Sequence, residues 1–295
     1  MCRSPGKGLT LSNNDPAHSI GLRPATGLVF MASELSILFR RRRTWALLLA
    51  LAAIPVLIAV AVRLTSGPPT GRGPAFLDQI TQNGLFVAVA AITVAIPLFL
   101  PLTVGVVAGD TIAGEASTGT LRYLLVAPVG RGRLLAVKFA GAVVFCLAAT
   151  LAVVLAGTLI GAVLFPVGPV TLLSGDTVSI GESLLRSALI CAYVTVSLTG
   201  LCAVGLFIST LTDVPVGAMA ATVVISVVSQ VVGQLPQLEL LHPWLLSHYW
   251  FGFADLLRQP IEWSSFAANA LLQSGYVLVF GALAYGRFTT RDVLA

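Results

Sequence analysis

Long runs of apolar residues, separated by short polar stretches, dominate the chain. Six runs are near 20 residues or longer, the length that an α-helix needs to cross a hydrocarbon core of about 30 Å. We expect these spans at about 45–62, 84–108, 134–165, 187–208, 215–232 and 266–285. The pattern therefore predicts an all-α polytopic membrane protein with six transmembrane helices.

Two of the runs carry residues that predict their geometry. Pro97 and Pro101 interrupt the second run, and each proline removes a backbone donor and clashes with the preceding turn, so we expect a kink there. The third run is longer than the hydrocarbon core and must tilt or extend beyond it. Small residues that permit close helix approach lie at Gly105, Gly109, Gly157 and Gly161.

Two further segments are apolar but unable to span. Residues 31–43 have Ser33 as a candidate helix cap and suit an interfacial elbow helix that ends in the basic residues Arg40, Arg41, Arg42 and Arg43. Residues 236–264 are broken by prolines into short pieces, for which interfacial or re-entrant helices on the outer face fit best. The expected outer aromatic belt consists of Trp244, Tyr249, Trp250 and Trp263.

The first 30 residues differ from the rest of the chain. They are rich in Pro, Gly, Asn and Ser and lack the continuous apolar core of a signal peptide, so we predict disorder and no cleavage. The elbow pattern begins at Met31, and one interpretation is that translation naturally starts there. The expected organisation is a tail over 1–30 and a six-span domain over 31–295.

Charge indicates orientation rather than a nucleic-acid partner. Of 295 residues only 10% are charged, and the Lys and Arg residues lie beside the apolar runs instead of alternating with aromatic residues on one surface. Across six spans, thirteen Lys and Arg residues lie on the side of the termini and four on the other side. The positive-inside rule therefore places both termini in the cytoplasm of a bacterial plasma membrane.

The span interiors argue against ion coupling. Charged side chains inside a bilayer cost roughly 2.5–3.5 kcal/mol each and are kept where they act, but the middles of these six runs contain no Asp, Glu, Lys, Arg or His. The last two runs contain three amide side chains, Gln230, Asn269 and Gln273, which we expect to bond neighbouring helices. An ion-coupled carrier or pump is disfavoured.

Residue types for chemistry are also missing from the spans. The histidines are His18, His242 and His248, and no zinc-protease or serine-hydrolase motif accompanies them, so we interpret the last two as interfacial packing residues. The cysteines form no C-x-x-C pair, and those inside apolar runs read as small buried hydrophobic residues: Cys146, Cys191 and Cys202. Gly6-Lys7 lacks the rest of a P-loop, so any ATP-driven motor is a separate chain.

The polar stretch 109–133 is the most informative part of the sequence. We expect a helix, a turn and a second helix: Asp110 supplies negative charge at the first helix start, Gly119 permits a left-handed turn, and Thr120 caps an amphipathic second helix. Asp110, Glu115 and Arg122 offer charge to a cytoplasmic partner. The alternative is a solvated connector with satisfied caps, and composition does not separate the two.

A resemblance favours the first interpretation. The string D-x-I-A-x-E-x-x-x-G-T-L-R-x-L-L-x-x-P, from Asp110 to Pro128 and continuing to Lys138, resembles the signature of ABC type-2 permeases, the membrane subunits of many bacterial ABC exporters. The Arg-rich elbow, the six spans and the end of the chain at 287–292 resemble that family too. Thr289 and Thr290 stand where basic residues are common, which leaves a C-terminal contact open.

The resemblance implies a non-catalytic transport subunit without cofactor or metal of its own. Two copies of a separate ATPase would bind ATP and Mg, and a second permease chain, identical or homologous, would complete the pore. A coupling helix at about 110–118 would sit in the ATPase, with Asp110, Glu115, Gly119, Thr120, Leu121 and Arg122 as the coupling residues. The expected cargo is amphipathic or lipophilic, such as a drug, peptide antibiotic or lipid. The alternatives are a regulatory or remodelling subunit coupled to an ATPase and an intramembrane enzyme.

Overall fold

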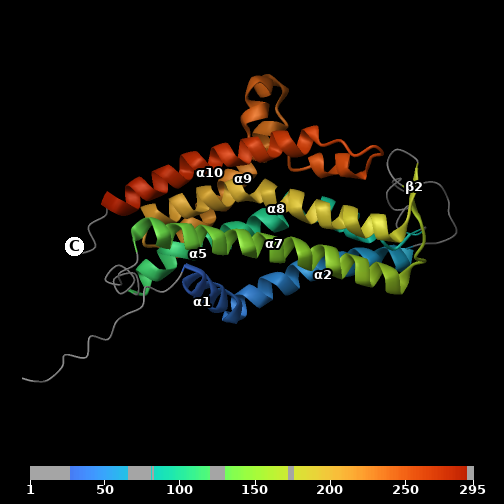
Figure 1. Cartoon of the computed structure of the whole chain (residues 1–295), viewed down its shortest axis with the longest axis horizontal. Coiled ribbons are helices and arrows are strands. Elements are labelled where there is room, and N and C mark those ends of the chain that lie inside the picture. The colour runs from blue at the N-terminus through green and yellow to red at the C-terminus, as the bar shows by residue number, and fades with distance from the viewer. Residues whose placement is uncertain (1–26, 66–80, 82, 120–129, 172–175, 291–295) are drawn as a thin grey trace, which may run out of the picture.

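The computed structural model describes residues 27–65, 81, 83–119, 130–171 and 176–290. Long helices lie side by side along one axis (Figure 1). Six described helices are long and apolar enough to cross a membrane: α2 (Arg42–Thr65), α5 (Phe99–Ser117), α7 (Arg131–Leu164), α8 (Ile180–Leu211), α9 (Pro215–Gly233) and α10 (Ser264–Thr290). The predicted fold class is confirmed.

Shorter elements complete the bundle. Helix α1 (Gly27–Arg40) precedes α2, and the apolar helix α4 (Phe86–Ala95) precedes α5. A small antiparallel hairpin of β1 (Val170–Thr171) and β2 (Thr177–Val178) follows α7, which the sequence pattern did not predict. The segment between α9 and α10 contains two 3₁₀ helices, η1 (Pro236–Trp244) and η2 (Gly252–Leu257).

Helix α8 forms the centre of the bundle. It packs against α5, α7, α9 and α10, and it is the most deeply buried of the six spans. Its Tyr193, Leu198 and Leu201 belong to the main hydrophobic core, together with Phe145 of α7 and Trp250 of the segment after η1. By contrast, α2, α9 and α10 keep exposed apolar faces, which suits helices that border lipid.

The second span is broken as the prolines predict. Helix α4 ends at Ala95, α5 begins at Phe99, and Leu98 between them has non-helical angles of φ −135° and ψ −55°. Because Pro101 has no N–H, the carbonyl of Pro97 loses its helical partner four residues later. Gln230 of α9 replaces that partner: its Nε2 donates to the Pro97 carbonyl at 2.6 Å.

The other buried amides also bond neighbouring elements. Asn269 Nδ2 donates to Ser197 Oγ on α8 at 2.8 Å, and Gln273 Nε2 donates to the carbonyl of Leu246 at 3.1 Å. Asn269 thus bonds a neighbouring helix as predicted, whereas Gln230 and Gln273 bond carbonyls outside helices, in the break at 96–98 and in the segment after η1. Amide groups inside a bundle are stabilised by such bonds because no water is present to replace them.

Small residues allow the close approaches that the sequence predicts. A Cβ atom on Gly109 would lie 2.7 Å from the Met219 nitrogen of α9, and one on Gly157 would lie 2.7 Å from Cα of Ala88 on α4. A Cβ on Gly161 would overlap the carbonyl of Gly84. These helices therefore pack backbone to backbone.

Three helix starts differ from the predictions. Helix α1 begins at Gly27, so Ser33 lies inside it and is not its cap. Helix α5 runs through Gly109 to Ser117, so Asp110 lies within a continuous helix instead of starting a new one. Helix α8 begins at Ile180, which places Arg186 in a helix rather than in a loop. Asp110 and Arg186 thus lie within helices that extend beyond the apolar runs. Other helices supply polar partners for both side chains.

The four residues of the predicted aromatic belt differ in burial. Trp244 and Trp263 are exposed, but Trp250 is fully buried and donates from Nε1 to the carbonyl of Ser197 at 3.1 Å. Tyr249 lies between these extremes, and its carbonyl accepts from the Tyr193 hydroxyl. In Figure 1 the orange loop that carries η1 projects beyond α10. Trp250 therefore anchors the segment to α8 and does not belong to an outward belt.

Candidate functional site

A group of charged side chains joins α1, the predicted elbow helix, to the second and third spans. Lys138 of α7 forms ion pairs with Glu34 of α1, at 2.8 Å, and with Glu115 of α5. Asp110 of α5 accepts from Arg41 at 3.3 Å and from Arg43 at 3.2 Å. We call this group the elbow cluster: Glu34, Arg41, Arg43, Asp110, Glu115 and Lys138.

Lys138 is the buried centre of the elbow cluster. Its side chain is 8% exposed, and the two carboxylates that flank it are 14% and 15% exposed. A buried ammonium is strongly unfavourable without partners, so two carboxylates around one lysine fit its burial. The pairing holds α1, α5 and α7 together at one point.

The Asp110 half of the cluster is more open. The side chains of Arg41 and Arg43 are 51% and 45% exposed, and exposed pairs of this kind contribute little individually. Arg43, however, also donates to the Val106 carbonyl at 3.4 Å and contacts Met219 Sδ at 3.1 Å. It therefore links the start of α2 to α5 and α9 through several weak contacts.

Ser209, near the end of α8, forms hydrogen bonds with the backbone of α5. Its hydroxyl donates to the carbonyl of Gly109 at 2.7 Å and accepts from the N–H groups of Ile112, at 3.0 Å, and Ala113, at 2.8 Å. The Gly109 carbonyl and the Ala113 N–H are helical partners in a regular α-helix, so this hydroxyl bridges both ends of a helical bond. Helices α5 and α8 are thereby joined beside Asp110.

A small cavity of about 70 Å³ lies at the elbow cluster, between α1, α2, α5 and α7. Sites for drug-sized ligands measure about 300–1,000 Å³, several times the volume of this cavity. It is too small for the drug-sized or lipid cargo that the sequence suggests. The arrangement therefore suits the mechanical connection of helices rather than binding of cargo.

The structure brings together part of the predicted coupling set. Asp110 and Glu115 both lie in the elbow cluster, so their charge is directed toward other helices of the same chain. Gly119 has φ +71°, the left-handed conformation predicted for it. Thr120, Leu121 and Arg122 lie outside the described residues. The exposed end of the segment consists of Ser117, Thr118 and Gly119.

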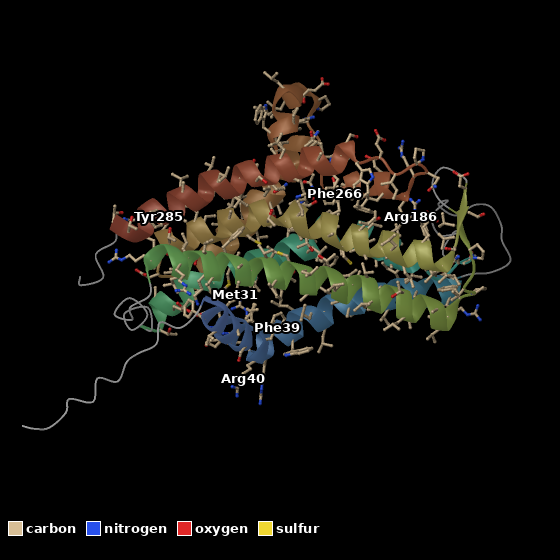
Figure 2. All side chains as sticks on the ribbon, viewed as in Figure 1. Met31, Phe39, Arg40, Arg186, Phe266 and Tyr285 are labelled. Carbon is tan, nitrogen blue, oxygen red and sulfur yellow. The ribbon has the colours of Figure 1, made fainter. Side chains whose placement is uncertain are left out.

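Of the four elbow arginines, two join the cluster and two do not. Arg41 and Arg43 pair with Asp110, whereas the salt bridges of the described ranges include neither Arg40 nor Arg42. In Figure 2, Arg40 lies at the outer corner of the bend between α1 and α2 and points away from the bundle. Arg41 and Arg43 thus bind Asp110, whereas Arg40 points outward.

Sequence reasoning missed the roles of Glu34, Lys138 and Ser209. Lys138 belongs to the permease motif, and a lysine inside an apolar run also indicates a buried partner. Glu34 and Ser209 carry no such local signal, because their partners lie 104 and 100 residues away along the chain.

No metal-binding group of three or more His, Cys, Asp or Glu residues occurs among the residues that the structure describes. His242 Nε2 contacts the carbonyl of Leu235 at 3.1 Å, and His248 packs edge-on against the Tyr249 ring. These contacts agree with a packing role. The three cysteines of the spans are buried and free, with Cys146 and Cys202 Sγ atoms 3.3 Å apart.

Comparison with known protein families matches residues 28–293 to the family described as ABC-2 family transporter protein. No curated protein matches the chain. The family match covers α1, all six spans and the segment between α9 and α10. It agrees with the resemblance of the 110–128 motif. The chain therefore belongs to the ABC-2 transporter family and is a multi-pass permease subunit of an ABC transporter.

Proposed function

We propose that the chain is the permease subunit of an ABC exporter that moves an amphipathic or lipophilic substrate out of the cytoplasm or the inner leaflet. It pairs with a second permease chain, identical or homologous, and with two ATPase chains that bind ATP and Mg. The complex lies in the bacterial plasma membrane with both termini of the chain in the cytoplasm. The lysine and arginine distribution supports this orientation, and Arg186 and Tyr285 lie near opposite ends of the bundle (Figure 2).

One observation carries the proposal. The expected coupling segment is not a separate loop helix but the end of α5, a continuous helix from Phe99 to Ser117. A force on its exposed end at 117–119 is therefore transmitted along a rigid helix to the break at 96–98. The elbow cluster and Ser209 join the same helix to α1, α7 and α8, so its movement affects the whole bundle.

ATP drives the cycle by shifting populations. When nucleotide closes the two ATPases, their contact with the ends of the two α5 helices differs between the membrane conformations, and this difference favours one of them. The chain performs no covalent step. Its residues transmit force and line the path between the two permeases.

The faces that the spans leave uncovered support the proposed cargo class. Helices α9 and α10 expose mainly Leu, Val and Ile side chains, among them Val216, Val224, Leu271 and Leu278. Faces of this kind accommodate lipid tails or the apolar part of a drug or peptide.

Co-purification with the ATPase tests the proposal. Thr118 is exposed at the end of α5, and its hydroxyl bonds back to the carbonyl of Gly114, so Thr118→Trp adds bulk at the surface that is expected to contact the ATPase. We expect this variant to lose ATPase association or coupled ATP turnover. The matched control is Thr65→Trp. Thr65 is an exposed threonine at the C-terminal end of α2, and its hydroxyl bonds back to the carbonyl of Ala61 in the same way. Failure of the native chain to bind any ATPase refutes the proposal.

Transport is tested separately in inside-out vesicles that contain the permease and ATPase. ATP-dependent uptake of a lipophilic fluorescent dye supports export, because the cytoplasmic face then points outward. ATP hydrolysis that responds to the permease without movement of any dye, lipid or peptide antibiotic favours instead a regulatory or remodelling subunit.

A further inference from the structure

An uninterrupted apolar stripe runs along the exposed side of α2. Its residues recur at intervals of three and four, so they lie on one face of the helix. From the start of α2 the stripe consists of Trp45, Leu49, Ala53, Val56 and Val60, all exposed. Leu49 is 66% exposed and Trp45 55%, whereas the opposite side of α2 is packed against α7 and α4. The stripe therefore borders lipid.

The stripe begins at two arginines that have no acidic partner among the residues that the structure describes. Arg42 lies three residues before Trp45 on the same face, and Arg40 lies at the outer corner of the bend (Figure 2). Both are exposed, and neither takes part in a salt bridge within the described ranges. Asp110, the acidic residue that pairs with this basic run, is already bonded to Arg41 and Arg43.

We propose that this surface holds an anionic phospholipid, with its phosphate on Arg40 and Arg42 and one acyl chain along the stripe of α2. A guanidinium group donates several hydrogen bonds in a planar array that matches phosphate oxygens. The four arginines exceed the single charge of Asp110, so the surface remains positive and favours a lipid with net negative charge over a zwitterionic one.

The length of the apolar stripe on α2 matches that of an acyl chain in one leaflet. One leaflet provides about 15 Å of hydrocarbon, half of a core of about 30 Å, which corresponds to about ten helical residues. Ten residues from Trp45 reach the middle of α2 near Pro55 and Val56, the point where an acyl chain of the same leaflet ends. Trp45 lies at the level where headgroup and chain meet, and its indole Nε1 is held by the Phe39 carbonyl at 2.8 Å.

This inference does not depend on the proposed export function. A permease of any direction, or a regulatory subunit, has the same elbow surface. The lipid is bound at the rim of the bundle, apart from any cargo path between two permeases. Failure of the transport experiments leaves the lipid proposal standing, and the reverse also holds.

Quenching of tryptophan fluorescence by brominated lipids tests the proposal in the full-length, reconstituted protein. The chain has four tryptophans, so the signal of Trp45 is obtained by difference from a Trp45→Phe variant. Brominated phosphatidylglycerol is compared with brominated phosphatidylcholine at equal amounts. The site variants are Arg40→Gln and Arg42→Gln. The matched control is Arg63→Gln, which removes an exposed arginine near the opposite end of α2.

We expect native Trp45 to prefer phosphatidylglycerol, and each site variant to lower that preference about fivefold, the effect of one basic residue near an anionic surface. Arg63→Gln leaves the preference unchanged. Equal quenching of native Trp45 by both lipids overturns the proposal, as does an equal loss in the Arg63→Gln control. Displacement of the brominated phosphatidylglycerol by free inorganic phosphate shows a soluble anion site and also overturns it.

Discussion

The hydrogen bond from Gln230 to the Pro97 carbonyl allows a direct test of why the second span is broken at 96–98. Replacing Gln230 with leucine keeps most of the side-chain volume and removes the donor that lies 2.6 Å from that carbonyl. The carbonyl then has no partner, because Pro101 supplies no N–H. A buried polar group left without a partner costs about 1–3 kcal/mol in soluble proteins. Hydrogen bonds between membrane helices average about 0.6 kcal/mol and reach about 1.7.

The cost of losing the bond to the Pro97 carbonyl should lie in the upper part of this range for membrane helices, because that carbonyl has no helical hydrogen bond to compensate. We therefore expect Gln230→Leu to lower the free energy of unfolding by about 1–1.5 kcal/mol. In a Pro101→Ala background the N–H is restored and can bond the same carbonyl within the helix. The cost of Gln230→Leu should then fall by about 1 kcal/mol, which is the coupling energy of a double-mutant cycle.

Unfolding in mixed micelles, followed by circular dichroism for all four proteins of the cycle, measures this coupling. The matched control is Gln273→Leu, which removes a bond to Leu246 and none to Pro97, and should cost the same in both backgrounds. If Gln230→Leu costs the same with proline and with alanine at 101, the two effects are additive. The explanation of the break by a missing N–H and a substituting amide is then wrong.

Three further substitutions test the elbow cluster, the close contact between α5 and α9, and the hydrogen bonds of Arg186. Lys138→Met leaves two buried carboxylates without their cation and should lower the free energy of unfolding by about 3–5 kcal/mol in the same assay. Lys138→Arg keeps the positive charge and should lose only part of that stability. Gly109→Ala places a Cβ about 2.7 Å from the Met219 nitrogen, so α5 and α9 must separate, which should cost about 1–3 kcal/mol and weaken ATPase coupling. Arg186→Met removes donors to Glu182 and to carbonyls of the segment after α9, so limited proteolysis of that segment should accelerate.

The sequence alone determined the six spans and the break in the second. Each span is a local property, because the free energy of placing a helix in lipid is a sum over its own residues. The break at 96–98 is local too, since a proline lacks its N–H whatever surrounds it. The permease motif around 110–128 was also readable without a structure, and the match over 28–293 agrees with it.

The tertiary structure decided where helices end and which charges pair. Local signals predicted a helix start at Asp110, yet α5 continues to Ser117 because α2, α7 and α8 supply partners for its polar residues. The partners of Asp110 and Lys138 lie up to 104 residues away, a distance that no local pattern encodes. The same holds for Trp250: its aromatic neighbours suggested an interface, but packing against α8 made it part of the core. Contacts between distant segments depend on how the helices pack together, and that packing is a property of the whole chain.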